Sequence, residues 1–230
     1  MRTASLILAA AAVLSLAGPA LAAPPPAQPV VVELFTSQGC SSCPPADAAL
    51  ALVADRDDVI ALSFGVTYWD DLGWKDTFAR PEFTARQKAY SKRLGDAPYT
   101  PEVVAGGRVA SVGNSKARIE ALIAKSRGPA AASITATSGS ATVTAGVAPR
   151  AGADVWLVRY DPRTVRVPVK AGENTGKTLP IRNVVRSLTR LGTWNGSQAT
   201  FRYQAAPQGL DSAVIVQTRD GGPILAAARA

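Results

Sequence analysis

The first half of the chain alternates continuous apolar runs with segments whose apolar residues recur at helical spacing. Apolar runs over residues 30–35 and 59–64 predict two buried strands. Helical spacing predicts three helices, over residues 44–56, 81–94 and 114–125, the last capped by Asn114. Two short β runs before the third helix flank Gly106-Gly107, a pair typical of a hairpin turn. This order of elements predicts an α/β sheet covered on both faces.

The second half of the chain has a different pattern. Short Thr- and Val-rich runs are separated by Gly, Pro and Asp, which predicts a smaller, sandwich-like β-rich unit. The runs cover residues 134–147, 154–160, 164–169, 200–204 and 213–218. Residues 181–191 fit a helix or a strand, and in both Arg182, Arg186 and Arg190 share one face because they are four residues apart. Such a face is either solvated surface or a docking surface for an anionic partner.

Charge also separates the two halves. Residues 23–128 carry 12 Lys+Arg and 12 Asp+Glu, whereas residues 129–230 carry 12 Lys+Arg and 5 Asp+Glu, so the net charge changes from 0 to +7. The stretch 126–133 lies at this change and is typical of a linker. We therefore expect one domain over residues 23–128 and a basic, β-rich domain over residues 129–230.

The first 22 residues have the pattern of a secretory signal peptide. Arg2 precedes an apolar run over residues 6–16, and Ala20-Leu21-Ala22 is an A-x-A cleavage site. The alternative, a membrane anchor, is disfavoured because the run is shorter than the ~20 residues that span a bilayer. No later segment is apolar enough to span one. We expect a periplasmic or secreted protein in an oxidising compartment.

The composition excludes several kinds of site. The chain has 230 residues, two cysteines and no histidine. It therefore lacks Ser-His-Asp and Cys-His nucleophile pairs, histidine metal ligands and a four-cysteine zinc site. It has no Gly-rich phosphate loop, and its dispersed basic residues argue against nucleic acid as a partner. We expect no cofactor and no metal ion.

Both cysteines lie in one C-x-x-C motif, Cys40-Ser41-Ser42-Cys43, between the first predicted strand and the first predicted helix. The N-terminus of a helix stabilises a thiolate, which is the reactive form of cysteine. The two-residue spacing lets the second thiol resolve a mixed disulfide made by the first. We expect Cys40 to be the exposed, attacking thiol and Cys43 the shielded, resolving one.

Two alternatives to redox chemistry remain. A plain structural disulfide would contribute only ~2 kcal/mol in the chain-entropy model, because the closed loop has about four residues. Metal capture by the two thiols is the other. Haem attachment requires histidine after the second cysteine, where this chain has Pro44.

Several long motifs resemble the secreted thioredoxin-like family known as domain of unknown function 1223. The first is V-V-E-L-F-T-S-Q-G-C-S-S-C-P-P-A-D over residues 31–47. The others are Tyr68-Trp69-Asp70, Gly73-Trp74-Lys75-Asp76, Phe83-Thr84-Ala85-Arg86-Gln87, Tyr99-Thr100-Pro101, Asp154-Val155-Trp156-Leu157-Val158-Arg159-Tyr160, Gly172-Glu173-Asn174, Asn183-Val184-Val185-Arg186 and Leu191-Gly192-Thr193-Trp194. The resemblance covers most of the chain after the signal peptide and implies a thioredoxin-like fold for the first domain.

The resemblance also implies roles for individual residues. Thr100-Pro101 would be a cis bond facing the cysteines, the alternative being an ordinary trans proline that begins a strand. Glu33 would be a buried acid that takes the proton of the resolving thiol, the alternative being a strand-end residue pointing to solvent. Family members often carry His, Asp and His where this chain has Gly65, Thr67 and Arg182. Any function of those three positions would then be altered here.

The sequence thus predicts a thiol–disulfide exchange protein whose site comprises Cys40, Cys43, Thr100, Pro101 and Glu33. Its partners would be protein or small-molecule thiols and disulfides. The alternative is a non-catalytic binding module with a structural disulfide and a basic second domain. The direction of exchange, reductive, oxidative or isomerising, does not follow from Ser41-Ser42.

Overall fold

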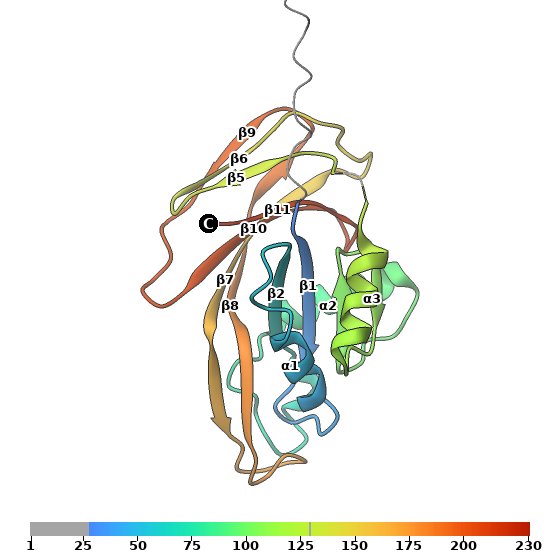
Figure 1. Ribbon diagram of the computed structural model, residues 1–230, viewed down its shortest axis with the longest axis vertical. Helices are drawn as coiled ribbons and strands as arrows, with labels where there is room; N and C mark the ends of the chain where they lie inside the picture. Colours follow the sequence, from blue (N-terminus) through green and yellow to red (C-terminus); the bar gives the residue numbers. More distant parts are fainter. Residues whose placement is uncertain (1–27, 129) are drawn as a thin grey trace, which may run out of the picture.

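The computed structural model describes residues 28–128 and 130–230. The predicted signal peptide, residues 1–22, lies outside the described residues. The described chain folds into a large mixed sheet of eight strands and a small antiparallel sheet of three (Figure 1). Within it, no helix is both long and apolar enough to cross a membrane.

The helices and strands occur in the following order. They are β1 (Val30–Thr36), α1 (Pro44–Ala51), β2 (Val59–Gly65), the short 3-10 helix η1 (Thr67–Trp69), α2 (Pro81–Leu94), β3 (Glu102–Ala105), β4 (Val109–Ser111), α3 (Lys116–Ser126), β5 (Ile134–Ala136), β6 (Ser140–Val143), β7 (Ala153–Pro168), β8 (Thr178–Trp194), β9 (Ala199–Arg202), β10 (Asp211–Thr218) and β11 (Ile224–Arg229).

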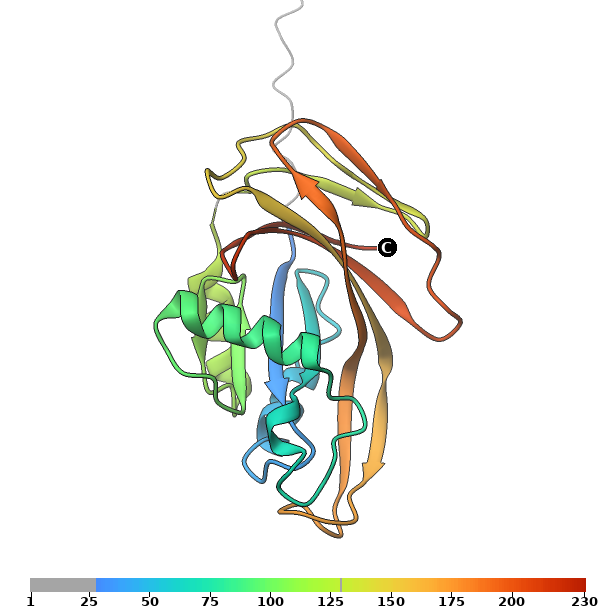
Figure 2. The ribbon, with the colours of Figure 1, turned by 180° about the vertical axis from the view of Figure 1, so that it is seen from behind.

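The first half forms the predicted α/β arrangement. Strand β1 pairs in parallel with β2 and antiparallel with β3, and β3 and β4 form the predicted hairpin through Gly106-Gly107. Both glycines have positive φ, and with Arg108 they form the three-residue connection between Ala105 and Val109. Helices α1 and α3 cover one face of the sheet, whereas α2 lies across the other face (Figures 1 and 2).

Alternation along β1 explains how the two faces are filled. Val32 and Leu34 pack against residues of α1 and α3, whereas Val31 and Phe35 pack against residues of α2. Because successive strand residues point to opposite faces, Glu33 belongs to the face covered by α2. Glu33 therefore lies on the opposite face of the sheet from α1, the helix that begins at Cys43.

The strands of the second half continue the same sheet. The order is β11-β10-β7-β8-β2-β1-β3-β4, and β8 joins β2 through the pairing of Ser63 with Val184. Only β5, β6 and β9 form a sheet of their own. The sheet therefore crosses the boundary expected at residues 128 and 129, and a separate second domain stays a prediction.

Two local predictions need correction, and one alternative is decided. Helix α1 ends at Ala51, not at Arg56, because residues 52–55 form turns that leave Leu52 exposed. The N-cap of α3 is Ser115, whose hydroxyl accepts a hydrogen bond from Arg118 N, and not Asn114. The ambiguous segment 181–191 belongs to strand β8.

The prediction that Arg182, Arg186 and Arg190 share one face assumed a regular strand, and strand β8 is not regular there. The pairing of β8 with β7 shifts register between Arg182 and Arg190, and Asn183 has a positive φ of 53°. Such bulges interrupt the alternation of side chains. Each arginine pairs with a different carboxylate: Arg182 with Asp55, Arg186 with Asp161 and Arg190 with Asp154.

Candidate functional site

Cys40 and Cys43 form a disulfide between the end of β1 and the start of α1, with their Cα atoms 5.4 Å apart. Cys43 is the N-cap of α1, and Pro44 and Pro45 occupy the first turn. Proline fits this turn because the first N–H groups of a helix have no partner within it. The structure therefore places the C-x-x-C motif where the sequence predicts it.

Ser42 places a hydroxyl against Cys40 Sγ. Ser42 Oγ lies 3.3 Å from Cys40 Sγ, and because a disulfide sulfur has no proton, the hydroxyl is the donor. The same hydroxyl can donate to a Cys40 thiolate after reduction. A hydrogen bond and a helix N-terminus both stabilise a thiolate, whereas the complete burial of Cys40 opposes it.

The expectation of an exposed Cys40 is wrong: both cysteines are 0% exposed. The connection between β7 and β8 covers them. The Asn174 side chain is fully buried and its Nδ2 donates to the carbonyl oxygens of Cys40, at 2.9 Å, and Gln38, at 3.0 Å. Glu173 Oε2 accepts a hydrogen bond from Ser41 N at 2.9 Å. A segment more than 130 residues away in sequence thus closes the disulfide loop.

The connection between β2 and α2 holds the same loop from another side. Asp76 accepts the N–H of Gln38 at 2.8 Å and those of Phe78 and Ala79. Trp74 Nε1 donates to Gln38 Oε1 at 2.9 Å. These contacts explain why the backbone before Cys40 is fixed although it has no regular structure.

The Thr100–Pro101 peptide bond is cis, as predicted, and Pro101 is buried. Trp69 connects this turn to the disulfide loop. Its Nε1 donates to Thr100 Oγ1 at 2.8 Å, and its Cβ lies 3.5 Å from the position that a Cβ on Gly39 would take. Thr100 is therefore linked through one indole to the residue before Cys40.

Glu33 is buried, but its contacts differ from those predicted. Arg86 Nε donates to Glu33 Oε1 at 2.6 Å and Arg86 Nη2 to Oε2 at 3.1 Å, while the Tyr90 hydroxyl also donates to Oε2. Both oxygens are thus bonded to α2, on the opposite face of the sheet from α1. We find no geometry here that would let Glu33 take a proton from Cys43.

Asp47 is the buried acid on the side of the cysteines, and the sequence reasoning did not identify it. It lies one helical turn after Cys43, and its N–H donates to the Cys43 carbonyl. Residues four apart share one face of a helix. Burial raises the pKa of Asp47 to about 8, against a hydrogen bond from Thr36 that lowers it. Its Oδ1 has no hydrogen-bond partner among the described residues.

A second buried acid follows the cis bond. Glu102 is 0% exposed and accepts a hydrogen bond from Gln87 Nε2 at 2.7 Å. Burial raises its pKa to about 7. The same amide nitrogen donates to the Tyr99 carbonyl, so Gln87 ties the cis turn to α2.

Gly65, Thr67 and Arg182, the three positions that differ from the family pattern, each contact a neighbouring connection of the chain. A Cβ at Gly65 would lie 2.8 Å from Ala79 N, so a histidine there would require a shift of the backbone. Thr67 contacts the Thr84 hydroxyl, and Arg182 pairs with Asp55. In this chain these positions stabilise connections rather than present a titrating side chain.

Comparisons with known proteins place the chain in a family. It is similar to a protein from Agrobacterium tumefaciens with a crystal structure, with 32% sequence identity and a TM-score of 0.70, over 87% of this chain and 92% of that one. HBP35 of Porphyromonas gingivalis has a similar fold, with 15% identity and a TM-score of 0.57, over 88% of this chain and 74% of that one. A search of curated proteins gave no match. A family model matches residues 31–217, so the chain belongs to the family described as protein of unknown function (DUF1223).

Proposed function

We propose that this protein is a thioredoxin-like thiol–disulfide exchange protein of an oxidising compartment. One observation carries the proposal: the Cys40–Cys43 disulfide begins α1, and Trp69, which donates to Thr100 next to the cis bond, packs beside Gly39, the residue before Cys40. Reactive cysteine pairs occur at helix N-termini because the helix stabilises the thiolate.

The chemistry balances as a two-electron exchange. In the reductive direction, the Cys40 thiolate attacks one sulfur of a substrate disulfide, and the other substrate sulfur leaves as a thiolate that takes up a proton. Cys43 loses its proton and attacks Cys40 Sγ, which releases the second substrate sulfur. The substrate disulfide is reduced and the Cys40–Cys43 bond forms. The oxidising direction runs the same steps in reverse.

Asp47, rather than Glu33, is suited to accept the proton of Cys43. A carboxylate with a pKa near the operating pH is an effective general base, and burial gives Asp47 a pKa of about 8. Its place one turn after Cys43 brings its side chain over the N-terminal turn of α1, since helical side chains lean toward the N-terminus.

Matched serine variants test the proposal. With the full exported protein and a disulfide-containing protein substrate, Cys43→Ser is expected to accumulate a mixed disulfide through Cys40, whereas Cys40→Ser is not. Both variants lack the internal disulfide, so each controls for the stability that the other loses. Equal trapping by the two variants, or trapping by neither, would contradict the assignment.

The location is a part of the proposal with its own test. The predicted signal peptide would place the mature protein in the periplasm or outside the cell, where a disulfide persists. N-terminal sequencing of the exported protein is expected to begin at Ala23. Recovery of a chain that still contains Arg2 would contradict it.

The burial of both cysteines favours a second candidate, a binding module whose disulfide only closes the loop. A measured pKa of the reduced Cys40 distinguishes the two candidates. Exchange requires a value well below ~8.5, whereas a structural cysteine buried among apolar groups has a raised value.

A further inference from the structure

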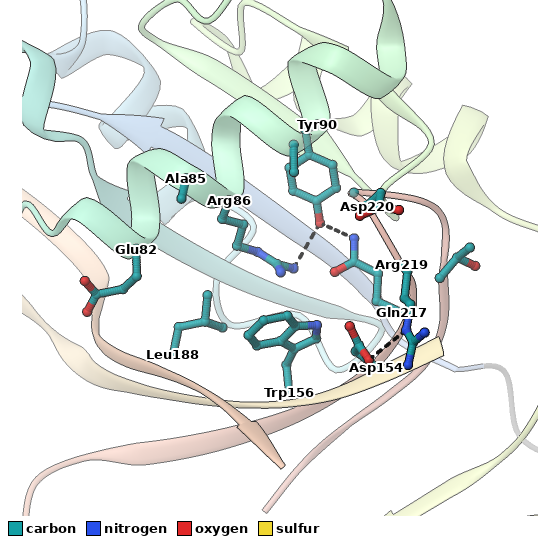
Figure 3. A pocket seen from close by; sticks show the side chains of 13 residues that line it. Glu82, Ala85, Arg86, Tyr90, Asp154, Trp156, Leu188, Gln217, Arg219 and Asp220 are labelled. Carbon is teal, nitrogen blue, oxygen red and sulfur yellow. Dashed lines mark hydrogen bonds and ion pairs between the residues drawn. The ribbon is translucent and has the colours of Figure 1, made fainter. Parts of the chain in front are cut away.

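A cavity of about 340 Å³ lies between α2 and the sheet, apart from the disulfide loop. Its walls come from α2, from β7, β8 and β10, and from the turn after β10 (Figure 3). Ligand sites for small molecules typically have volumes of roughly 300–1,000 Å³, so the cavity is at the lower end of that range. None of its lining residues belongs to the C-x-x-C motif or the cis turn.

A network of buried polar groups forms one side of the cavity. Arg86, which is bonded to Glu33, also donates from Nη2 to the Tyr90 hydroxyl oxygen at 3.0 Å. Gln217 Nε2 donates to the same oxygen at 2.9 Å. Arg86 and Gln217 are therefore neighbours across Tyr90. The positive charge of Arg86 is balanced by Glu33, so the network has no net charge to offer an anion.

This network has one unused donor and one unused acceptor. Arg86 is 8% exposed and Gln217 is 3% exposed. Neither Arg86 Nη1 nor Gln217 Oε1 has a hydrogen-bond partner among residues 28–128 and 130–230. Figure 3 shows both side chains extending into the pocket. Neither atom is among the fully buried unpaired atoms of the described residues, so both reach the open space of the cavity, where they are available to a ligand.

The opposite wall is flat and apolar. Trp156 on β7 and Leu188 on β8 form this wall, whereas Ala85 and Ala89 line the cavity from α2. The Arg86 guanidinium lies over the Trp156 ring, with its Cζ 5.9 Å from the ring centroid. A planar ring can stack on an indole at such a site. The cavity therefore combines a stacking surface with a polar edge.

The charges at the rim select against an anion. Three acids, Glu82, Asp154 and Asp220, line the pocket together with two arginines, Arg219 and the Arg86 that is bonded to Glu33. Arg219 is itself paired with Asp154. Glu82 and Asp220 thus have no paired arginine within the part of the chain that the structure describes, and they would repel a negatively charged ligand.

We propose that this cavity binds a small, neutral, planar molecule that carries an amide. Its ring would stack on Trp156, its carbonyl oxygen would accept from Arg86 Nη1, and its N–H would donate to Gln217 Oε1. The donor and acceptor of one amide group match this pair, whereas a carboxylate offers acceptors alone. This inference does not depend on the redox proposal, because the two sites share no residue.

Benzamide is a suitable probe, and benzoate is its anionic counterpart of nearly the same shape. In an NMR titration of the full mature protein, we expect benzamide to shift the indole N–H signal of Trp156, with a dissociation constant of about 1–10 mM for so small a molecule. The Trp156→Phe variant identifies that signal. Benzoate is expected to bind at least about tenfold more weakly, because it cannot donate to Gln217 and meets the acidic rim.

Two matched variants on exposed helix positions locate the binding. Ala85→Phe places a ring at the cavity mouth and is expected to weaken benzamide binding about tenfold or more. Ala124→Phe makes the same change on α3, away from the cavity, and is expected to leave binding unchanged. Equal binding by these two variants would overturn the site. Tighter binding of benzoate than of benzamide would overturn the ligand class, and no binding of benzamide up to about 50 mM would overturn the proposal.

Discussion

The disulfide loop and the cavity beside α2 lie on the same sheet but differ in how far their functional groups are covered. At the disulfide, both cysteines are 0% exposed and the connection between β7 and β8 is bonded over them through Glu173 and Asn174. At the cavity, a fully paired charge network is buried but leaves a donor and an acceptor open to the space above it. The two regions also use different acids: Asp47 belongs to the first and Glu33 to the second.

The difference teaches that burial of an acid does not by itself indicate its role. Glu33 has a counter-charge and two hydrogen-bond donors, so its burial is compensated within α2. Asp47 has one hydroxyl donor and an unbonded oxygen, and its pKa is raised to about 8 as a result of that burial. An acid whose ionised form is poorly compensated is the one suited to move a proton near neutral pH.

The largest expected effect concerns the buried ion pair. Glu33→Gln leaves Arg86 buried without its counter-charge, and we expect the free energy of unfolding to fall by about 3–5 kcal/mol, measured by urea titration. The reduction potential of Cys40–Cys43 is expected to stay the same, because Glu33 faces α2.

A double variant controls for the loss of stability in that experiment. Glu33→Leu combined with Arg86→Met removes both charges, and we expect it to regain most of the stability lost in Glu33→Gln. A change of potential of about 30 mV or more in Glu33→Gln, equivalent to about 1.4 kcal/mol, would show that Glu33 acts on the cysteines after all.

The next effect in size is the dependence of stability on pH that Asp47 causes. Folding raises the pKa of this acid from 3.8 to about 8, so the folded state binds the proton more tightly and stability falls as the pH rises through that window. Relative to Asp47→Asn, the wild type is expected to lose about 3 kcal/mol of stability between pH 5 and pH 8. Parallel stability curves for the two proteins, measured by urea titration at several pH values, would contradict this.

A smaller effect is expected from opening the cover over the disulfide. Asn174→Ala removes two hydrogen bonds to the disulfide loop, each with a net contribution of about 0.5–1.5 kcal/mol. We therefore expect dithiothreitol to reduce Cys40–Cys43 roughly tenfold faster in this variant, as followed by alkylation of the freed thiols. The reason is that access to sulfur limits exchange at a buried disulfide.

Thr175→Ala is the matched control for the cover. Thr175 lies in the same connection, and its hydroxyl bonds to Gly172 O rather than to the disulfide loop. We expect its rate of reduction to equal that of the wild type. An unchanged rate in Asn174→Ala would mean that the covering segment already opens freely.

Features set by local sequence were predicted correctly. Helix α2 spans Pro81–Leu94, as the spacing of its apolar residues and the following Gly95 indicate. Gly106-Gly107 lies in the turn of the hairpin formed by β3 and β4. The C-x-x-C motif lies between β1 and α1 as predicted, and the cis Thr100–Pro101 bond agrees with what the family resemblance implied. The helix and the hairpin depend on neighbouring residues, whose conformational preferences are visible in the sequence, whereas the cis bond was expected from the resemblance alone.

Features set by distant contacts were not predictable in this way. The bulges of β8 and its pairing with β2 depend on strands from both halves of the chain. Asn174 covers Cys40 across 134 residues, and nothing in its local sequence indicates that contact. Asp47 had a local signal, because an acid one turn after the second cysteine must lie on the cysteine side of its helix, whereas the alternation in β1 places Glu33 away from it.

The smallest expected effect is at the rim of the cavity. Arg190→Gln removes one of two arginines that contact Asp154, and Arg219 still pairs with that carboxylate. Arg190 is 45% exposed at its side chain, so solvent screens its charge and we expect a smaller loss of stability than in any of the other variants. Thermal unfolding in low and high salt provides the measurement. A loss as large as that of Glu33→Gln would mean that the ion pairs at the rim, and not only the buried network, hold the sheet against α2. The contrast between a buried, bonded interior and a solvent-exposed rim would then no longer hold.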